Sequence, residues 1–121
     1  MKKRLFSLLL ALMLFFSMVP AAAQAAALDN GIVYDVYNTH VVITDYTGSA
    51  ERLTIPARIE GLPVSTIATD AFSECNSLVE ITVPEGVQRL ERGAFSKSVK
   101  LTTVHLPDGL TQIERLTFDG C

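Results

Sequence analysis

The sequence predicts a mainly β solenoid in which about three 23-residue coils stack through short parallel strands, joined by turns or short helices. Phe72, Phe95 and Phe118 are each 23 residues apart. Segments 78–95 and 101–118 repeat the same order of apolar residues, proline and glycine. Such a period indicates stacked repeats, because one coil cannot bury its apolar side chains alone. The chain's 121 residues and formal net charge of −3 exclude a multidomain protein and a basic nucleic-acid binder.

Residues 1–27 have the pattern of a secretory signal peptide. Basic residues follow the initial Met, Leu5–Val19 is uncharged, and Ala21–Ala27 is rich in small residues. A retained membrane anchor is the alternative, but a span needs about 20 apolar residues and this run has 15. We expect cleavage after Ala25, with cleavage two residues earlier or later left open. The remainder is then secreted or at the cell surface, with no stable membrane span.

Residues 28–49 predict a β-hairpin that caps the first coil. The β-rich runs Gly31–Tyr37 and Val41–Tyr46 are separated by a short polar turn. The other end has no matching cap, since the chain stops at Cys121, two residues short of a full third coil. Either the sequence is a fragment of a longer protein, or its last coil exposes an apolar edge that favours self-association.

The second repeat shows how one coil is built. Ile81 and Val83 are two residues apart, so both point inward from a short strand. Pro84 lacks an N–H group and ends strand pairing, and Gly86 allows the chain to turn a corner. Leu90 then returns to the interior on the next side. Coils stacked at about 4.8 Å make a leucine-rich-repeat solenoid, with coils at 50–77, 78–100 and 101–121, the last incomplete.

Ala71–Cys75, with the sequence Ala-Phe-Ser-Glu-Cys, resembles the repeat signature of the BspA-like leucine-rich repeat family of bacterial secreted and surface proteins. Ile55-Pro56, followed by Val64 and Ile67, resembles that family's usual first repeat. The resemblance covers about residues 50–121 and implies a solenoid used in adhesion or recognition. It implies no cofactor and offers no catalytic residues.

The cysteines and histidines, residue types that serve as catalytic groups or metal ligands in other proteins, form no catalytic or metal-binding pattern in this sequence. Cys75 and Cys121 occupy the same position two coils apart, about 10 Å by the strand spacing, whereas a disulfide needs Cα atoms within about 7 Å. We therefore expect two free thiols that pack as small apolar groups and no metal site. His40 and His105 lie apart, and no nucleophile motif accompanies them. The chain is predicted not to be an enzyme.

The outward positions of the three predicted strands form a candidate binding face. Stacking in register places Arg52 beside Glu80 and Thr82 beside His105. Residues 28–121 carry seven basic and 13 acidic residues, so we expect no nucleic acid as a partner. The prediction is a recognition or adhesion module that binds an extracellular protein or glycan. The alternative is a structural N-terminal spacer of a longer multidomain surface protein. The face comprises Arg52, Thr54, Glu80, Thr82, Thr103 and His105.

A second column of charged residues stacks Glu91 on Glu114 and Arg92 on Arg115. Like charges directly opposite each other destabilise a sheet. We expect diagonal contacts between these glutamates and arginines to relieve the repulsion.

Overall fold

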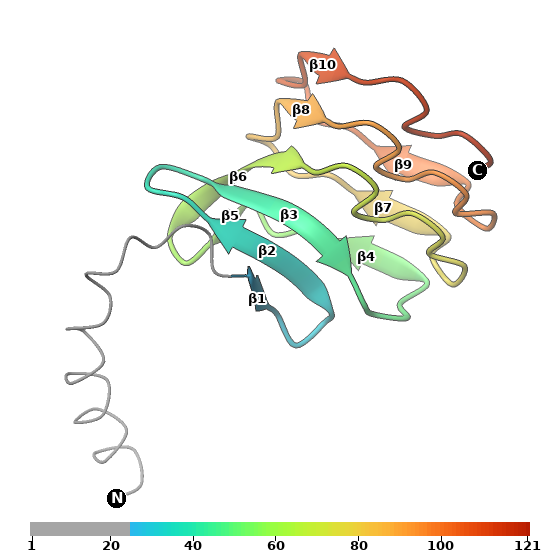
Figure 1. Cartoon of the computed structure of the whole chain (residues 1–121), viewed down its shortest axis with the longest axis horizontal. Helices are drawn as coiled ribbons and strands as arrows, with labels where there is room; N and C mark the ends of the chain where they lie inside the picture. Colours follow the sequence, from blue (N-terminus) through green and yellow to red (C-terminus); the bar gives the residue numbers. More distant parts are fainter. Residues whose placement is uncertain (1–24) are drawn as a thin grey trace, which may run out of the picture.

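The computed structural model describes residues 25–121, which form strands and turns and contain no helix. The predicted signal peptide lies outside this part up to residue 24, and none of the described residues belongs to a helix that could cross a membrane. Figure 1 shows the strands arranged in a stack of coils. The strands are β1 Ala25–Ala27, β2 Ile32–Val36, β3 Val41–Tyr46, β4 Arg52–Thr54, β5 Arg58–Ile59, β6 Leu62–Ile67, β7 Glu80–Thr82, β8 Arg89–Leu90, β9 Thr103–His105 and β10 Gln112–Ile113.

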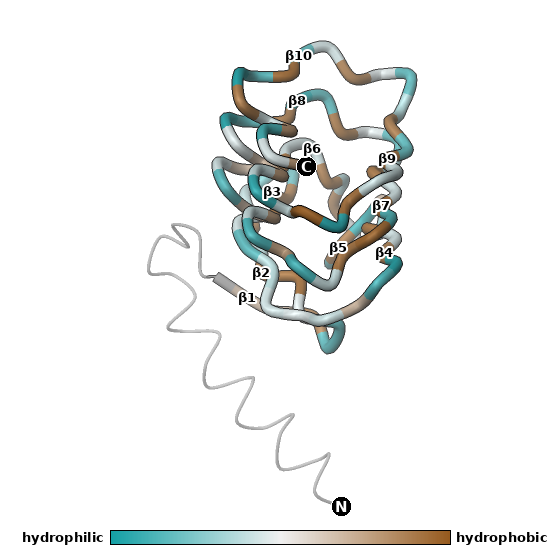
Figure 2. Tube along the Cα trace, turned by 90° about the vertical axis from the view of Figure 1, so that its right-hand side faces the viewer, coloured by the Kyte–Doolittle hydropathy of each residue, from teal (hydrophilic) through white to brown (hydrophobic). Residues whose placement is uncertain are grey.

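Two sheets run along the stack on different sides of each coil (Figures 1 and 2). The short sheet has the order β4-β7-β9, and all its pairs are parallel. The long sheet has the order β1-β2-β3-β6-β8-β10, and from β3 onward its pairs are parallel. Glu80 pairs with Thr103, and Arg89 pairs with Gln112, so both sheets keep the 23-residue register. The predicted mainly β solenoid of about three coils is confirmed, with turns in place of short helices.

The hairpin predicted in residues 28–49 is present as β2 and β3. β2 pairs antiparallel with β1 on one side, and β3 pairs parallel with β6, so the hairpin continues the long sheet. Ile32, Val41 and Ile43 are fully buried and belong to the same core as the coils. These contacts fit an N-terminal cap, which stays a prediction.

The first coil is longer than the others because it contains a small hairpin. Arg58 pairs with Pro63 and Ile59 pairs with Leu62, both antiparallel, as β5 turns into β6. The turn between them brings Gly61 to a positive φ of 78°. The extra residues therefore form a small hairpin within the first coil, and the register between coils is kept.

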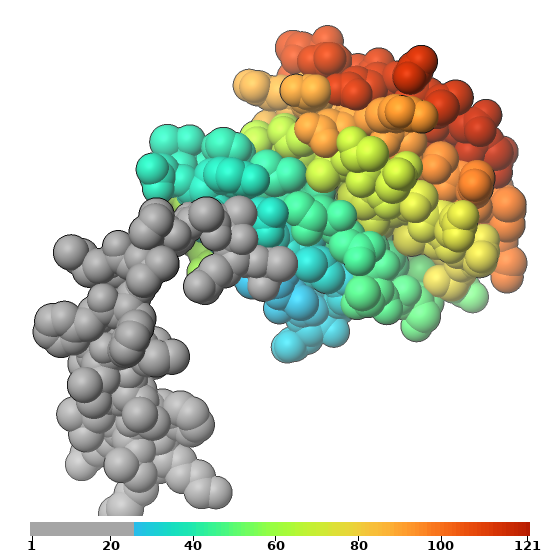
Figure 3. Space-filling view, in the orientation of Figure 1, coloured from blue at the N-terminus to red at the C-terminus, as the bar shows by residue number. Residues whose placement is uncertain are grey.

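A column of aromatic rings runs through the core. Phe72 lies 5.3 Å from Tyr46 and 5.4 Å from Phe95, and Phe95 lies 5.5 Å from Phe118, measured between ring centroids. Phe72 and Phe95 are fully buried, whereas Phe118 is 36% exposed because it belongs to the third coil. Figure 3 shows this coil, in red, at the end of the stack. Its apolar edge, expected from the sequence, also exposes Leu106 and Ile113.

The corner after the long sheet contains residues in the left-handed backbone region. Asp70, Gly93 and Leu116 occupy the same position in successive coils and have φ values of 57°, 65° and 62°. A large side chain is unfavourable there, so Leu116 is strained.

At the predicted proline-glycine corner, Gly86 has a φ of 101° as expected, whereas Gly109 is not among the described residues with positive φ.

Candidate functional site

The candidate face is the outer side of the short sheet. In β4 the middle residue Leu53 is buried and its two neighbours are exposed, and in β7 Ile81 is buried in the same way. Successive strand residues point to opposite faces, so this alternation sends the polar side chains outward. The structure places Arg52 opposite Glu80 and brings His105 opposite Thr82, as the sequence predicted.

Glu80 joins the three strands through its two carboxylate oxygens. Its Oε2 lies 3.4 Å from Nε of Arg52, and its Oε1 lies 2.7 Å from Nε2 of His105. The His105 contact is diagonal, because His105 is the register partner of Thr82. The hydrogen bond to His105, with a smaller effect from the charge of Arg52, lowers the pKa of the Glu80 carboxyl below its ordinary value. Glu80 is therefore held as a carboxylate at the centre of the face.

The threonines of the face have free hydrogen-bonding capacity. Among the described residues, the hydroxyls of Thr54, Thr82 and Thr103 have no side-chain or backbone partner, and Thr54 and Thr103 are exposed. A hydroxyl can donate one hydrogen bond and accept two. The face therefore presents donors and acceptors along three adjacent coils, with one central carboxylate already paired.

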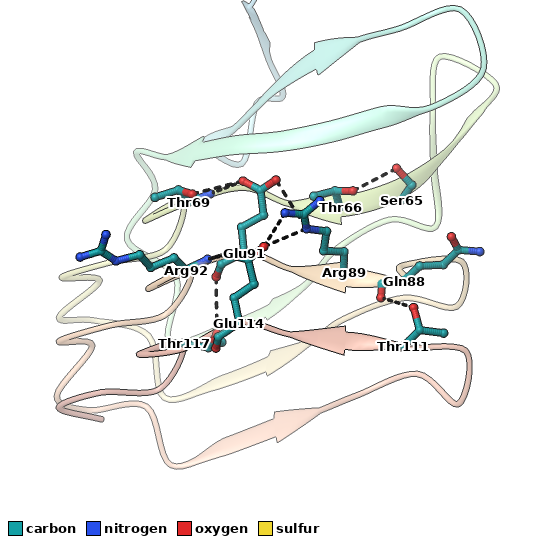
Figure 4. Close-up of polar contacts among 10 residues, drawn as sticks. All are labelled: Ser65, Thr66, Thr69, Gln88, Arg89, Glu91, Arg92, Thr111, Glu114 and Thr117. Atoms are coloured by element: carbon teal, nitrogen blue, oxygen red, sulfur yellow. Dashed lines mark hydrogen bonds and ion pairs between the residues drawn. The ribbon is translucent and has the colours of Figure 1, made fainter.

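The long sheet differs, because its polar side chains bind one another (Figure 4). Arg89 donates from Nε to Oε1 of Glu114 at 3.0 Å, and the same Nε lies 3.9 Å from Glu91. Glu91 accepts hydrogen bonds from the backbone N–H and the hydroxyl of Thr69 at 2.9 and 3.2 Å. Thr111 donates to the carbonyl of Gln88 at 3.0 Å. The charged groups of Arg89, Glu91 and Glu114 are therefore paired within the molecule.

The expected diagonal relief of the stacked glutamates is found, but another arginine supplies it. Arg89, not Arg92 or Arg115, lies between Glu91 and Glu114. Arg92 instead contributes its backbone N–H to Oε2 of Glu114 at 3.2 Å. The sequence signal for Arg89 is its position two residues before Glu91, which directs both side chains to the same face.

Cys75 is half-buried and packs against the core, as expected for a small apolar group, whereas Cys121 is exposed. Cys121 Sγ donates to the carbonyl of Phe95 at 3.2 Å, and at the equivalent position Ser98 donates to the carbonyl of Phe72 at 2.7 Å. Ser98 also accepts from the backbone N–H of Cys75 at 3.0 Å. Both cysteines are free, and burial raises the pKa of each thiol. The expected apolar packing is thus found for Cys75 and not for Cys121, and hydrogen bonds in this column also link the coils.

No group of three or more metal-ligating side chains occurs among residues 25–121. His40 does not lie in the face: its ring stacks on Tyr37 with centroids 5.0 Å apart, at the tip of the hairpin. The face offers hydrogen bonding and paired charges, which suits recognition of a polar ligand.

A family model described as a BspA type leucine rich repeat region of six copies matches residues 45–121, more than half of the chain. A comparison with curated proteins found no match.

Solved structures of bacterial leucine-rich repeat proteins share the fold. The T. pallidum protein is 33% identical with a TM-score of 0.69, over 82% of this chain and 43% of that one. A Bacteroides ovatus protein is 25% identical with a TM-score of 0.64, over 78% of this chain and 27% of that one. A Faecalibacterium prausnitzii cell surface protein is 24% identical with a TM-score of 0.65 and the same coverages, and shows the fold alone. The chain thus spans less than half the length of each of these three proteins.

Proposed function

Because the chain belongs to the BspA-type leucine-rich repeat family, we propose that it is a secreted or cell-surface recognition module that binds an extracellular protein or glycan. The proposed binding surface is the outer face of β4, β7 and β9. One observation carries the proposal: this face leaves the hydroxyls of Thr54, Thr82 and Thr103 without partners among the described residues, whereas Arg89, Glu91 and Glu114 of the long sheet pair with one another. Free donors and acceptors on a rigid sheet are available to a ligand.

The proposed role is non-catalytic, as is typical of this family and fold. Function resides in the residues of a site rather than in a fold, and the face holds no side chain poised as a nucleophile by a general base. Recognition hot spots favour Trp, Tyr and Arg. The face has Arg52 as its only member of that set, so we expect a modest affinity.

The protein is proposed to be exported and to act outside the cell or at its surface, and the predicted signal peptide supports this location. The related F. prausnitzii protein is described as a cell surface protein. N-terminal sequencing of the exported chain should give a start near Ala26, whereas an intact Met1 on exported protein would contradict export through this signal.

The binding face is tested with mucin, a heavily glycosylated protein, and with deglycosylated mucin, each immobilised for surface plasmon resonance. Thr103→Arg fills the face with a long side chain that can reach Glu80, so folding should not suffer. We expect it to weaken binding about tenfold or more, because the long side chain covers the face and the hydrogen bond of the Thr103 hydroxyl to the ligand is lost. Thr111→Arg is the matched control, an exposed threonine of the same coil on the long sheet.

Retained affinity in Thr111→Arg together with loss in Thr103→Arg supports the proposal. Binding to intact mucin alone assigns a glycan ligand, and binding to both surfaces assigns a protein ligand. Absence of binding to either surface, or equal losses in both variants, would overturn it.

A second role, that of a structural spacer in a longer surface protein, is favoured by the apolar edge of the third coil. Leu106, Ile113 and Phe118 are 42%, 49% and 36% exposed there. Further coils or a second copy of the chain would bury them. In sedimentation velocity, we expect the chain to self-associate and Ile113→Glu to be monomeric; a wild-type chain that stays monomeric at the highest soluble concentration would contradict this use of the edge.

A further inference from the structure

A groove with a volume of about 350 Å³ crosses the corner that follows β6, β8 and β10. All three coils contribute to it, because Asp70 follows β6, Arg92 and Lys97 follow β8, and Leu116 and Asp119 follow β10. The volume lies at the lower end of the range of small-ligand sites, about 300–1,000 Å³. It is separate from the face of the short sheet.

Arg92 provides an unpaired cation in this groove. Within the described part of the chain, its guanidinium has no hydrogen bond or ion pair, while its backbone N–H is held by Glu114. Figure 4 shows the guanidinium extending away from the Arg89–Glu114 pair. Lys97 is held only by a long contact of 3.7 Å to Glu74, both side chains being about two-thirds exposed. A free guanidinium fork matches the two oxygens of a carboxylate.

The other lining groups limit the kind of anion that fits. Asp70 and Asp119 balance the two cations, so the groove has no excess positive charge for a highly charged phosphate or sulfate. Their oxygens can accept hydrogen bonds from ligand hydroxyls, and Ser96 can donate or accept. Leu116 supplies an apolar wall: it is 49% exposed and held at a φ of 62°. Backbone strain of this kind tends to cluster at ligand sites.

We propose that this groove binds a hexuronate, the carboxylate-bearing sugar of acidic glycans. The sugar carboxylate pairs with Arg92, the ring hydroxyls donate to Asp70 and Asp119, and the apolar face of the ring packs on Leu116. One carboxylate with several hydroxyls matches one free guanidinium surrounded by acceptors. The groove does not depend on the face proposed above, so each can fail without the other.

The probe is trigalacturonate, titrated into the purified chain by calorimetry, with its methyl ester as the uncharged counterpart. We expect saturable binding of the acid that weakens about tenfold or more in the ester and in Arg92→Met. Arg115→Met is the matched control, because Arg115 occupies the same column one coil further and does not line the groove. It should keep the wild-type affinity.

No binding of trigalacturonate, or equal losses in the two arginine variants, would overturn the proposal. So would displacement by inorganic sulfate at the same concentration as galacturonate, which would indicate a simple anion site. Leu116→Gly provides a second test, since glycine suits the left-handed backbone and circular dichroism should be unchanged. Lower affinity in this folded variant supports the apolar wall, and unchanged affinity refutes the sugar-ring placement.

Discussion

Replacing Phe95 with alanine should lower the free energy of unfolding by about 4–5 kcal/mol. Truncation of a buried phenylalanine costs about 3–5 kcal/mol, and stacked ring pairs are worth about 0.5–1.5 kcal/mol each beyond burial. Phe95 is fully buried and has rings on both sides, Phe72 at 5.4 Å and Phe118 at 5.5 Å. The effect therefore belongs at the upper end of the range.

Phe118→Ala is the matched control, because this residue has the same place in the repeat but is 36% exposed and has one ring neighbour. Burying a whole phenylalanine side chain is worth about 1.5–3 kcal/mol, and about two-thirds of Phe118 is buried. Its truncation should therefore lower the free energy of unfolding by about 1–2 kcal/mol. Urea unfolding followed by far-ultraviolet circular dichroism gives both values, with unchanged slopes as a check on two-state behaviour. Losses that agree within about 1 kcal/mol would refute the buried stack, since experimental error alone is smaller than the expected difference.

Three other predictions concern the coil contacts. Ser98→Ala should cost about 1–3 kcal/mol in urea unfolding, because it leaves a buried carbonyl and an N–H without their partner; a loss near zero would contradict that role. Since the pKa of Glu80 is lowered in the fold, its contribution to stability is present above the ordinary glutamate pKa and is lost as pH falls through the folded value. In an NMR titration, His105→Ala should raise that pKa, and an unchanged midpoint would count against the hydrogen bond. Cys75 and Cys121 should remain free thiols, so a mass two units low without reductant would contradict the coil spacing.

The coil register could be predicted from the sequence because it depends only on counting residues. The spacing of Phe72, Phe95 and Phe118 sets how far each coil advances the chain, and parallel pairing then places equivalent positions side by side. The pairing of Thr82 with His105 follows from this period and is confirmed. Comparing the repeats with one another therefore shows which residues of successive coils are equivalent. A sequence without repeats offers no such comparison.

The side-chain contacts could not be predicted in the same way. Glu80 reaches diagonally to His105, and Arg89 rather than Arg92 lies between the stacked glutamates. These choices depend on rotamers and on local backbone direction, which residue spacing does not specify. Ser98 occupies the position of the two cysteines in the middle coil, and only the approach of a neighbouring carbonyl reveals its hydrogen bonds.

The turns and the groove also lay beyond the sequence pattern. The repeat permits either a short helix or a turn before the next strand, and the left-handed residues Asp70 and Leu116 accompany a turn. Leu116 gives no signal for that conformation, since leucine rarely adopts it. The groove combines residues from three coils, so it becomes visible only once the coils are stacked.

Oxidation of engineered cysteine pairs tests the stacked register most directly. With Cys75 and Cys121 replaced by serine, the pair Thr82→Cys and His105→Cys lies on adjacent register positions, where parallel strands bring Cα atoms to about 4.8 Å, within disulfide range. The pair Thr54→Cys and His105→Cys lies two coils apart, at about 10 Å. The stacked register predicts a loss of about two mass units, corresponding to one disulfide, for the first pair and no loss for the second. A disulfide in the second pair only, or in neither, would contradict the solenoid register.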